Sequence, residues 1–118
     1  MTCGQEQVIR RLNQINFPAD RMKVVAGFIE KTSQNANLPK QVCFAYVDFD
    51  FYEPIKIALE FLDHKVPIGG VIIIDDYGHF SEGAASAVDE FVMVREQRYT
   101  KEPSPEWASK FCVLTRRA

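Results

Sequence analysis

VDFDFYE at residues 47–53 and VIIIDDY at residues 71–77 decide the fold of this chain. Each stretch is an apolar run that ends abruptly in carboxylates, which is typical of a buried strand in a parallel sheet. Pro54 directly follows the first stretch and suits the first turn of a helix, where its missing N–H costs nothing. The apolar residues between positions 55 and 62 continue that helix. A parallel βαβ unit with short connections is therefore predicted, in an α/β fold.

Four carboxylates follow the two predicted strands, Asp48 and Asp50 after the first and Asp75 and Asp76 after the second. Ligands of open α/β sheets gather at the carboxyl ends of the strands, so these acids are expected to converge on one crevice. Crowded carboxylates repel one another unless a cation is present. Oxygen ligands without histidine or cysteine favour Mg²⁺, Ca²⁺ or Mn²⁺ over zinc. Alternatively, the acids only cap the next helix or face water.

The rest of the chain supplies further predicted elements on either side of this unit. An amphipathic helix with one buried face is predicted for residues 5–17, from apolar residues at helical spacing. Residues 30–40 are polar and predict a loop or at most a short helix. The other predicted elements are a strand at 22–26, the first βαβ strand at 42–47, a helix from 81 to 94 with Ser81 as its N-cap, and two antiparallel strands at 99–102 and 110–115.

Bulk composition excludes some classes of function. The chain has 118 residues, which suits one domain. Its formal net charge of -2 gives no electrostatic case for nucleic acid or an anionic membrane as a partner. No apolar run approaches the ~20 residues of a membrane span, and no signal peptide is evident, so a cytoplasmic location is expected.

The three cysteines lack metal-binding or disulfide spacing. Cys43 and Cys112 lie in apolar runs and are expected to be buried as small hydrophobic residues. Trp107, near the last predicted strand, is expected to pack in the core or against the hairpin.

Several motifs in this order resemble the macrocin O-methyltransferase (TylF-type) family. They are VDFDFYEP at 47–54, GGVIIIDDYG at 69–78, Gly83 and AVDEF at 87–91. The resemblance runs from about residue 6 to 117 and covers the C-terminal part of the family's fold. It implies a Rossmann-like methyltransferase that uses S-adenosylmethionine and a divalent metal such as Mg²⁺ to methylate hydroxyls, typically on sugars of natural products. The family usually has glycine at the position of Phe49, where a bulky side chain could alter the acceptor pocket.

The resemblance implies roles for the four acids. Asp48, Asp75 and Asp76 match the metal-ligand positions, and Asp50 matches a position suited to the general base. The implied reaction is in-line methyl transfer: the metal acidifies the acceptor hydroxyl, a carboxylate accepts its proton, and the oxygen attacks the sulfonium methyl.

The resemblance also suggests residues that contact the two small molecules. Gly27 and Phe28 occupy the place where such folds usually contact the adenine of S-adenosylmethionine. Tyr52, Tyr77 and His79 follow the acids and are expected to line the binding site of the hydroxyl acceptor, or else to pack within the domain.

The donor-binding part of the family's fold is not recognisable in the sequence. The usual strand order, 3-2-1-4-5-7-6, would lack strands 1 and 2, which lie between strand 3 and strand 4, together with the Gly-rich turn that holds the methionine moiety. The strand at 42–47 would then have a bare edge, so a homo-oligomer formed through that edge is expected. Weak or no binding of S-adenosylmethionine to this chain alone is expected as well.

Two other functions stay open at this point. The chain could be a non-catalytic, truncated methyltransferase-like module for assembly or partner binding. Alternatively, Asp48 and Asp50 could be the DxD of a phosphotransferase, or Asp75 and Asp76 the acidic pair of a response-regulator receiver. Both of these last alternatives fit poorly. The DxD motif of a phosphotransferase of the phosphatase type needs a small β-branched residue at the position of Tyr52. In a receiver, the acidic pair follows the first strand of the fold.

Overall fold

The computed structural model describes residues 4–35, 37–77, 82–108 and 110–118. Helices and strands follow one another as α1 (Gln5–Gln14), η1 (Ala19–Arg21, a 3-10 turn), α2 (Ile29–Thr32), β1 (Phe44–Val47), α3 (Tyr52–Asp63), β2 (Val71–Asp75), α4 (Glu82–Met93), β3 (Tyr99–Pro103) and β4 (Phe111–Arg116). The βαβ unit and the antiparallel pair are therefore confirmed. The predicted N-cap, Ser81, lies outside the described residues.

One four-stranded sheet has the order β1-β2-β4-β3. The strands β1 and β2 are parallel, with Val47 beside Ile74, and β4 runs antiparallel to both β2 and β3. This arrangement is the 4-5-7-6 end of the strand order that the family resemblance implies. The partial Rossmann-like sheet with a C-terminal antiparallel pair is thus confirmed, and β1 is one of its edges.

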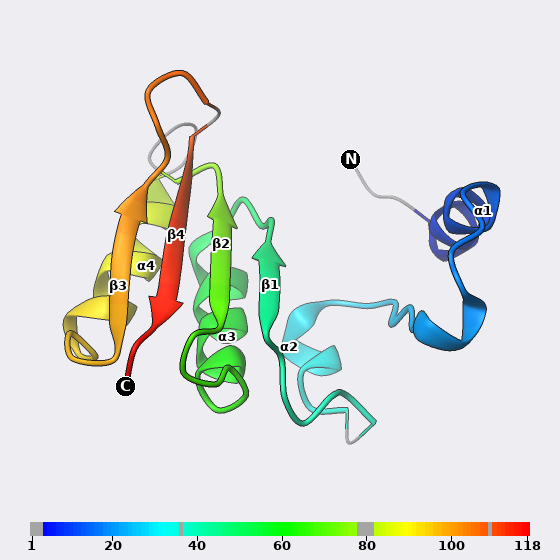
Figure 1. Ribbon diagram of the computed structural model, residues 1–118, viewed down its shortest axis with the longest axis horizontal. Coiled ribbons are helices and arrows are strands. Elements are labelled where there is room, and N and C mark those ends of the chain that lie inside the picture. Colours follow the sequence, from blue (N-terminus) through cyan, green and yellow to red (C-terminus); the bar gives the residue numbers. More distant parts are fainter. Residues whose placement is uncertain (1–3, 36, 78–81, 109) are drawn as a thin grey trace.

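One face of the sheet is covered by α3 and α4, which lie behind the strands in Figure 1. Alternate strand residues enter the core, as the period of a strand requires. Ile72, Ile74 and Leu114 are fully buried between the sheet and the fully buried Ile55 and Leu59 of α3. Their intervening neighbours are only partly buried, because they face the side that α3 and α4 leave uncovered.

The segment before β1 differs from the prediction. Residues 22–26 form no strand, so the predicted strand at 22–26 is wrong. An apolar extended segment becomes a strand only where a neighbour supplies hydrogen bonds, and the described residues offer none there. The helix α1 is present but has no buried residue, and it stands apart from the sheet in Figure 1. Its predicted buried face is therefore wrong as well.

Two predictions about single residues also fail. Cys43 is exposed, because it lies just before β1, in the segment leading to the uncovered edge. Trp107 is 87% exposed in the connection between β3 and β4, so it packs neither in the core nor against the hairpin. Cys112, in the middle of the sheet, is buried as expected, and burial raises the pKa of its thiol to about 11.

Candidate metal centre

Three carboxylates meet at the carboxyl ends of β1 and β2. Asp48 directly follows β1, Asp75 ends β2, and Asp76 comes next. One carboxylate oxygen from each lies within 4.8 Å of the oxygens from the other two. Because β1 and β2 are parallel neighbours in register, their ends bring Asp48 beside Asp75. The convergence expected from the sequence is therefore present for these three acids, and their role as metal ligands stays a prediction.

The backbone of Asp76 explains how two consecutive side chains reach one point. Successive residues of a strand face opposite sides of the sheet, which would separate Asp75 from Asp76. Asp76 instead has a left-handed conformation, with φ of 56°. A non-glycine residue rarely adopts this conformation, and aspartate is one of the few that tolerate it. The turn brings both carboxylates to the same side, at some cost in backbone strain.

The charges in this cluster conflict with one another. Partial burial raises the pKa of Asp48, and the charges of Asp75 and Asp76 raise it further. One oxygen from each of the three carboxylates lies within 4.8 Å of the others, so their negative charges repel one another. A divalent cation would neutralise this repulsion. The donor set and its electrostatics therefore fit a hard cation such as Mg²⁺.

Asp50 lies close to this cluster but outside it. Its side chain is exposed, and its charge contributes to raising the pKa of Asp48. The intervening Phe49 is partly buried and packs against the hydrophobic core. Asp50 is thus not part of the group of three carboxylates, and its role as the general base stays a prediction.

Tyr52 and Tyr77 both bind acids on α4. The Tyr52 hydroxyl donates to the Glu90 carboxylate, and the Tyr77 hydroxyl donates to Asp89 Oδ1 at 2.8 Å. Lys101 Nζ donates to both members of the Tyr77–Asp89 pair, at 2.8 Å from Asp89 Oδ1 and 3.2 Å from the Tyr77 hydroxyl. These bonds tie the start of α3 and the end of β2 to α4. Acceptor binding by the two tyrosines stays a prediction, and His79 lies outside the described residues.

Gly27 and Phe28 lie in the connection that leads into α2. Gly27 has φ of 132°, where a side chain would be strained. Phe28 precedes the first residue of α2, and its side chain is 80% exposed. The structure therefore gives these residues the shape of a turn before a helix. Their contact with the adenine of a cofactor stays a prediction.

Tyr46 is a neighbour of the acids that the sequence analysis missed. It lies in β1 beside Ile73, and it lines an open hollow together with Ile73, Asp75 and Phe111. Burial raises the pKa of Tyr46, and the nearby Asp75, Asp48 and Asp76 raise it further. A signal was available, because Tyr46 is two residues before Asp48, and alternate residues of a strand share a face.

A second group of charges lies at the opposite end of the sheet, around the buried Asp63. This residue ends α3, and its side chain is 3% exposed. The hydroxyl of Tyr99 donates to Asp63 Oδ1 at 2.8 Å. Arg95, Arg98 and Arg116 place guanidinium nitrogens 3.1, 3.0 and 3.6 Å from its oxygens. One carboxylate thus joins the end of α3 to the segment after α4 and to β4.

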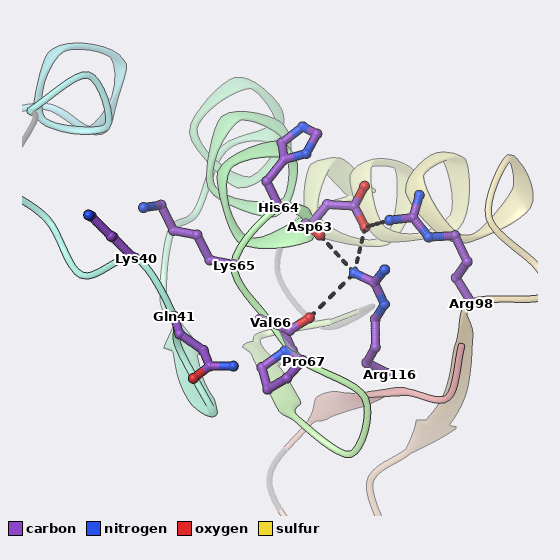
Figure 2. A pocket seen from close by; sticks show the side chains of 9 residues that line it. All are labelled: Lys40, Gln41, Asp63, His64, Lys65, Val66, Pro67, Arg98 and Arg116. Atoms are coloured by element: carbon purple, nitrogen blue, oxygen red, sulfur yellow. Dashed lines mark hydrogen bonds and ion pairs between the residues drawn. The ribbon is translucent and has the colours of Figure 1, made fainter.

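A pocket of about 420 Å³ opens beside Asp63. Figure 2 shows Arg98 and Arg116 directed toward Asp63, with Lys40 and Lys65 on the far side. The guanidinium of Arg116 also donates to the backbone carbonyls of Asp63 and Ala118, and Lys65 Nζ donates to the carbonyl of Pro39. Because protein groups already bind Arg98, Arg116 and Lys65, the arrangement around Asp63 is that of a structural ion-pair cluster.

The fold is shared with known methyltransferases. The O-methyltransferase NovP superposes with a TM-score of 0.85 at 22% identity, over 98% of this chain and 46% of its own. A protein from Clostridium thermocellum, described as a candidate rRNA methylase, superposes with a TM-score of 0.74 at 15% identity, over 96% of this chain and 66% of its own. The chain therefore has a Rossmann-like methyltransferase fold and spans about half the length of NovP.

The family is identified by the sequence itself. Residues 1–116 match the macrocin O-methyltransferase (TylF) family, and the chain belongs to that family. No curated protein matches the sequence. The resemblance seen in the motifs around the acids is thereby confirmed, and use of S-adenosylmethionine is implied by the family. In the described part of the chain, no helix is long and apolar enough to cross a membrane.

Proposed function

We propose that this chain carries the metal and acceptor side of an O-methyltransferase that depends on S-adenosylmethionine and a divalent cation. The observation that carries the proposal is the convergence of Asp48, Asp75 and Asp76 at the ends of two parallel strands, in a member of the macrocin O-methyltransferase family. The acceptor would be a hydroxyl of a sugar or a similar natural product. A cytoplasmic location stays a prediction.

Each acid has a separate task in this proposal. Asp48, Asp75 and Asp76 would hold the cation, and their crowding explains why the cluster favours one. Bound there, Mg²⁺ supplies a Lewis acid that lowers the pKa of the acceptor hydroxyl, and S-adenosylmethionine supplies the methyl group. Asp50 is exposed beside the cluster and would accept the hydroxyl proton. Gly27 and Phe28 would contact the adenine, and Tyr52, Tyr77 and His79 would line the acceptor site.

Replacing Asp50 with asparagine is expected to reduce methyl transfer by about 10²–10⁴-fold, which is the usual contribution of a general base. Metal affinity should be unchanged, because Asp50 lies outside the group of three carboxylates. The measurement is transfer of labelled methyl from millimolar S-adenosylmethionine to a panel of sugar hydroxyls in the presence of Mg²⁺. Asp20→Asn, an exposed acid in η1, is the matched control.

Two outcomes would count against this function. Transfer that persists in EDTA would contradict the metal dependence, and equal rates for Asp50→Asn and Asp20→Asn would contradict the role of Asp50. Absence of transfer from the wild-type chain at every concentration of the methyl donor would favour the second function considered next.

The exposed edge of β1 favours a second function, that of an assembly module. The strand β1 reads FAYV and carries no charged residue, and Phe44 and Tyr46 are each 56% exposed. Natural edge strands usually carry charges or proline that discourage pairing with another chain, and β3 at the other edge has Lys101, Glu102 and Pro103. We infer that β1 pairs with β1 of a second copy, forming a homodimer with one continuous sheet.

Phe44→Lys is expected to weaken self-association at least tenfold, since a lysine on an edge strand discourages pairing. Sedimentation velocity over a range of concentrations measures the monomer–dimer equilibrium. Glu102→Lys, on the opposite edge, should leave the equilibrium unchanged. A wild-type chain that stays monomeric at every concentration would show that this edge does not pair with itself.

A further inference from the structure

The free edge of β1 has a backbone pattern that restricts how a second strand can pair with it. The carbonyl of Cys43 accepts a hydrogen bond from Val71 N at 3.0 Å, so Cys43 directs its carbonyl toward β2. In an extended strand this direction alternates from one residue to the next, and the parallel pairing with β2 continues through Val47. Phe44 and Tyr46 therefore direct their N–H and C=O groups to the edge that no other described strand occupies.

We propose that β1 strands of two copies pair antiparallel about a two-fold axis at Ala45, with Phe44 of each copy opposite Tyr46 of the other. This inference rests on the assembly function proposed above, because it assumes that the two β1 edges meet. The axis stands perpendicular to the sheet, so the two four-stranded sheets become continuous and α3 and α4 of both copies cover the same face. Such an interface uses the same surface on both copies and closes as a dimer.

Backbone hydrogen bonding selects this register. Opposite residues of an antiparallel pair exchange N–H···O=C bonds only where both direct their backbone groups to the other strand. Pairing Phe44 with Tyr46 meets this condition for all four outward residues of the two strands. Pairing Phe44 with Phe44 would set Tyr46 opposite Val42, whose N–H already donates to the carbonyl of Lys65 at 3.0 Å. Pairing Tyr46 with Tyr46 would set Phe44 opposite Asp48, one of the three crowded carboxylates.

The side chains of β1 fit the same register. Residues directly opposite each other in an antiparallel pair lie on one face of the sheet, where aromatic pairs are favourable. Phe44 and Tyr46 are each 56% exposed on the face that α3 and α4 leave uncovered, and two Phe44–Tyr46 pairs would cover part of this surface. Ala45 packs against the core on the other face and is small enough to meet Ala45 of the second copy at the axis.

The charges on either side of β1 favour a second copy as the occupant of this edge and an antiparallel orientation. Lys40 lies in the exposed segment before β1, and the exposed Asp48 and Asp50 lie just after it. Antiparallel pairing brings the lysine of each copy to the side of the acids of the other. Parallel pairing would instead set the acids of the two copies side by side. The two ends of β1 are therefore complementary to each other but not to themselves.

Disulfide trapping tests the register in a chain whose Cys3 and Cys43 are replaced with serine. Opposite residues of a pair without hydrogen bonds have Cα atoms about 4.5 Å apart, so Ala45→Cys should form a covalent dimer in oxidised glutathione. Phe44→Cys or Tyr46→Cys alone would set the two cysteines diagonally, about 7–8 Å apart, and should stay unlinked. Non-reducing electrophoresis measures the linked fraction, at a concentration where sedimentation velocity gives a dimer.

The double variant Phe44→Cys/Tyr46→Cys is the positive control for the two single variants. It loses both aromatic rings but sets cysteines directly opposite each other, about 5.5 Å apart, so it should link. Failure of this control to link while Ala45→Cys does would overturn the pairing of Phe44 with Tyr46.

Three further results would overturn the inference. Linking of Phe44→Cys or Tyr46→Cys alone, to the extent of Ala45→Cys, would show another register. A sedimenting dimer that links in none of the variants would show that the copies meet elsewhere, and self-association itself would stand. A wild-type chain that stays monomeric would refute the register and the assembly function together, leaving β1 as an edge for a strand of another polypeptide.

Discussion

Replacing Asp63 with asparagine is expected to lower the free energy of unfolding by about 3–5 kcal/mol, which is the usual cost of removing one partner from a buried ion pair. The Asp63 side chain is 3% exposed and lies within 3.1 Å of nitrogens from both Arg95 and Arg98. An asparagine removes the counter-charge of Arg98, and it leaves Arg95 only the half-exposed carboxylate of Glu60 at 3.1 Å. Urea denaturation followed by circular dichroism measures the loss. Because the free energy of unfolding of a small domain is only ~5–15 kcal/mol, this substitution should remove a large part of the total stability.

Asp89→Asn is the matched control for this prediction. Asp89 also pairs with a basic side chain, Lys101, at 2.8 Å, but its own side chain is 53% exposed. Exposed ion pairs contribute about 0–1 kcal/mol, so this substitution should cost no more than that. Equal losses for the two variants would show that the cluster around Asp63 is not a buried structural centre.

The cluster around Asp63 should also make the stability of the protein depend on pH, because the pKa of Asp63 differs from its ordinary value. Burial raises this pKa, but hydrogen bonds from Tyr99 and Arg95 and the charge of Arg98 outweigh the burial, so the net pKa is below its usual range. A carboxylate with a lowered pKa in the folded state stabilises the protein above the unfolded-state pKa of about 3.9, and this contribution is lost as the pH falls through the folded-state value. Wild-type stability should therefore fall more steeply below about pH 4 than that of Asp63→Asn. Parallel stability curves between pH 3 and 7 would contradict this assignment.

Replacing Asp75 with asparagine is expected to have opposite effects with and without metal. In EDTA the variant should be at least as stable as the wild type, because it removes one of three crowded carboxylates. With Mg²⁺ at 100 times its dissociation constant, the wild type should gain about 2.7 kcal/mol and the variant almost nothing. Thermal unfolding of both proteins, with EDTA or with Mg²⁺, measures the difference.

Asp20→Asn is the control for this comparison, since it removes an exposed acid in η1, outside the group of three carboxylates. It should respond to Mg²⁺ as the wild type does. A Mg²⁺-dependent gain in Asp75→Asn equal to that of the wild type would mean that the ion stabilises the chain at another place.

The predictable part of the fold is the part that local patterns encode. The runs at 47–53 and 71–77 give β1 and β2 correctly, because an apolar run ending in carboxylates reflects burial and a strand end together. The convergence of Asp48, Asp75 and Asp76 follows from the parallel pairing of two strands joined by one helix. The left-handed turn at Asp76, which brings the third carboxylate into the group, could not be predicted from residue types alone.

The failures concern features that depend on distant neighbours. Residues 22–26 have the composition of a strand, but pairing decides whether a strand forms. Cys43 and Trp107 are apolar in type, yet their exposure depends on which elements cover them. The cluster around Asp63 draws its arginines from positions 95, 98 and 116, and no local pattern links these to α3.

The most direct test of the metal centre is a calorimetric Mn²⁺ titration of the wild-type chain and of variants in which each of the four acids becomes asparagine. One ion should bind per wild-type chain. Asp48→Asn, Asp75→Asn and Asp76→Asn should each lose more affinity than the ~10–100-fold that outer-shell residues contribute, whereas Asp50→Asn should bind like the wild type. Binding that survives all three ligand substitutions, or an equal loss in Asp50→Asn, would contradict the proposed metal centre.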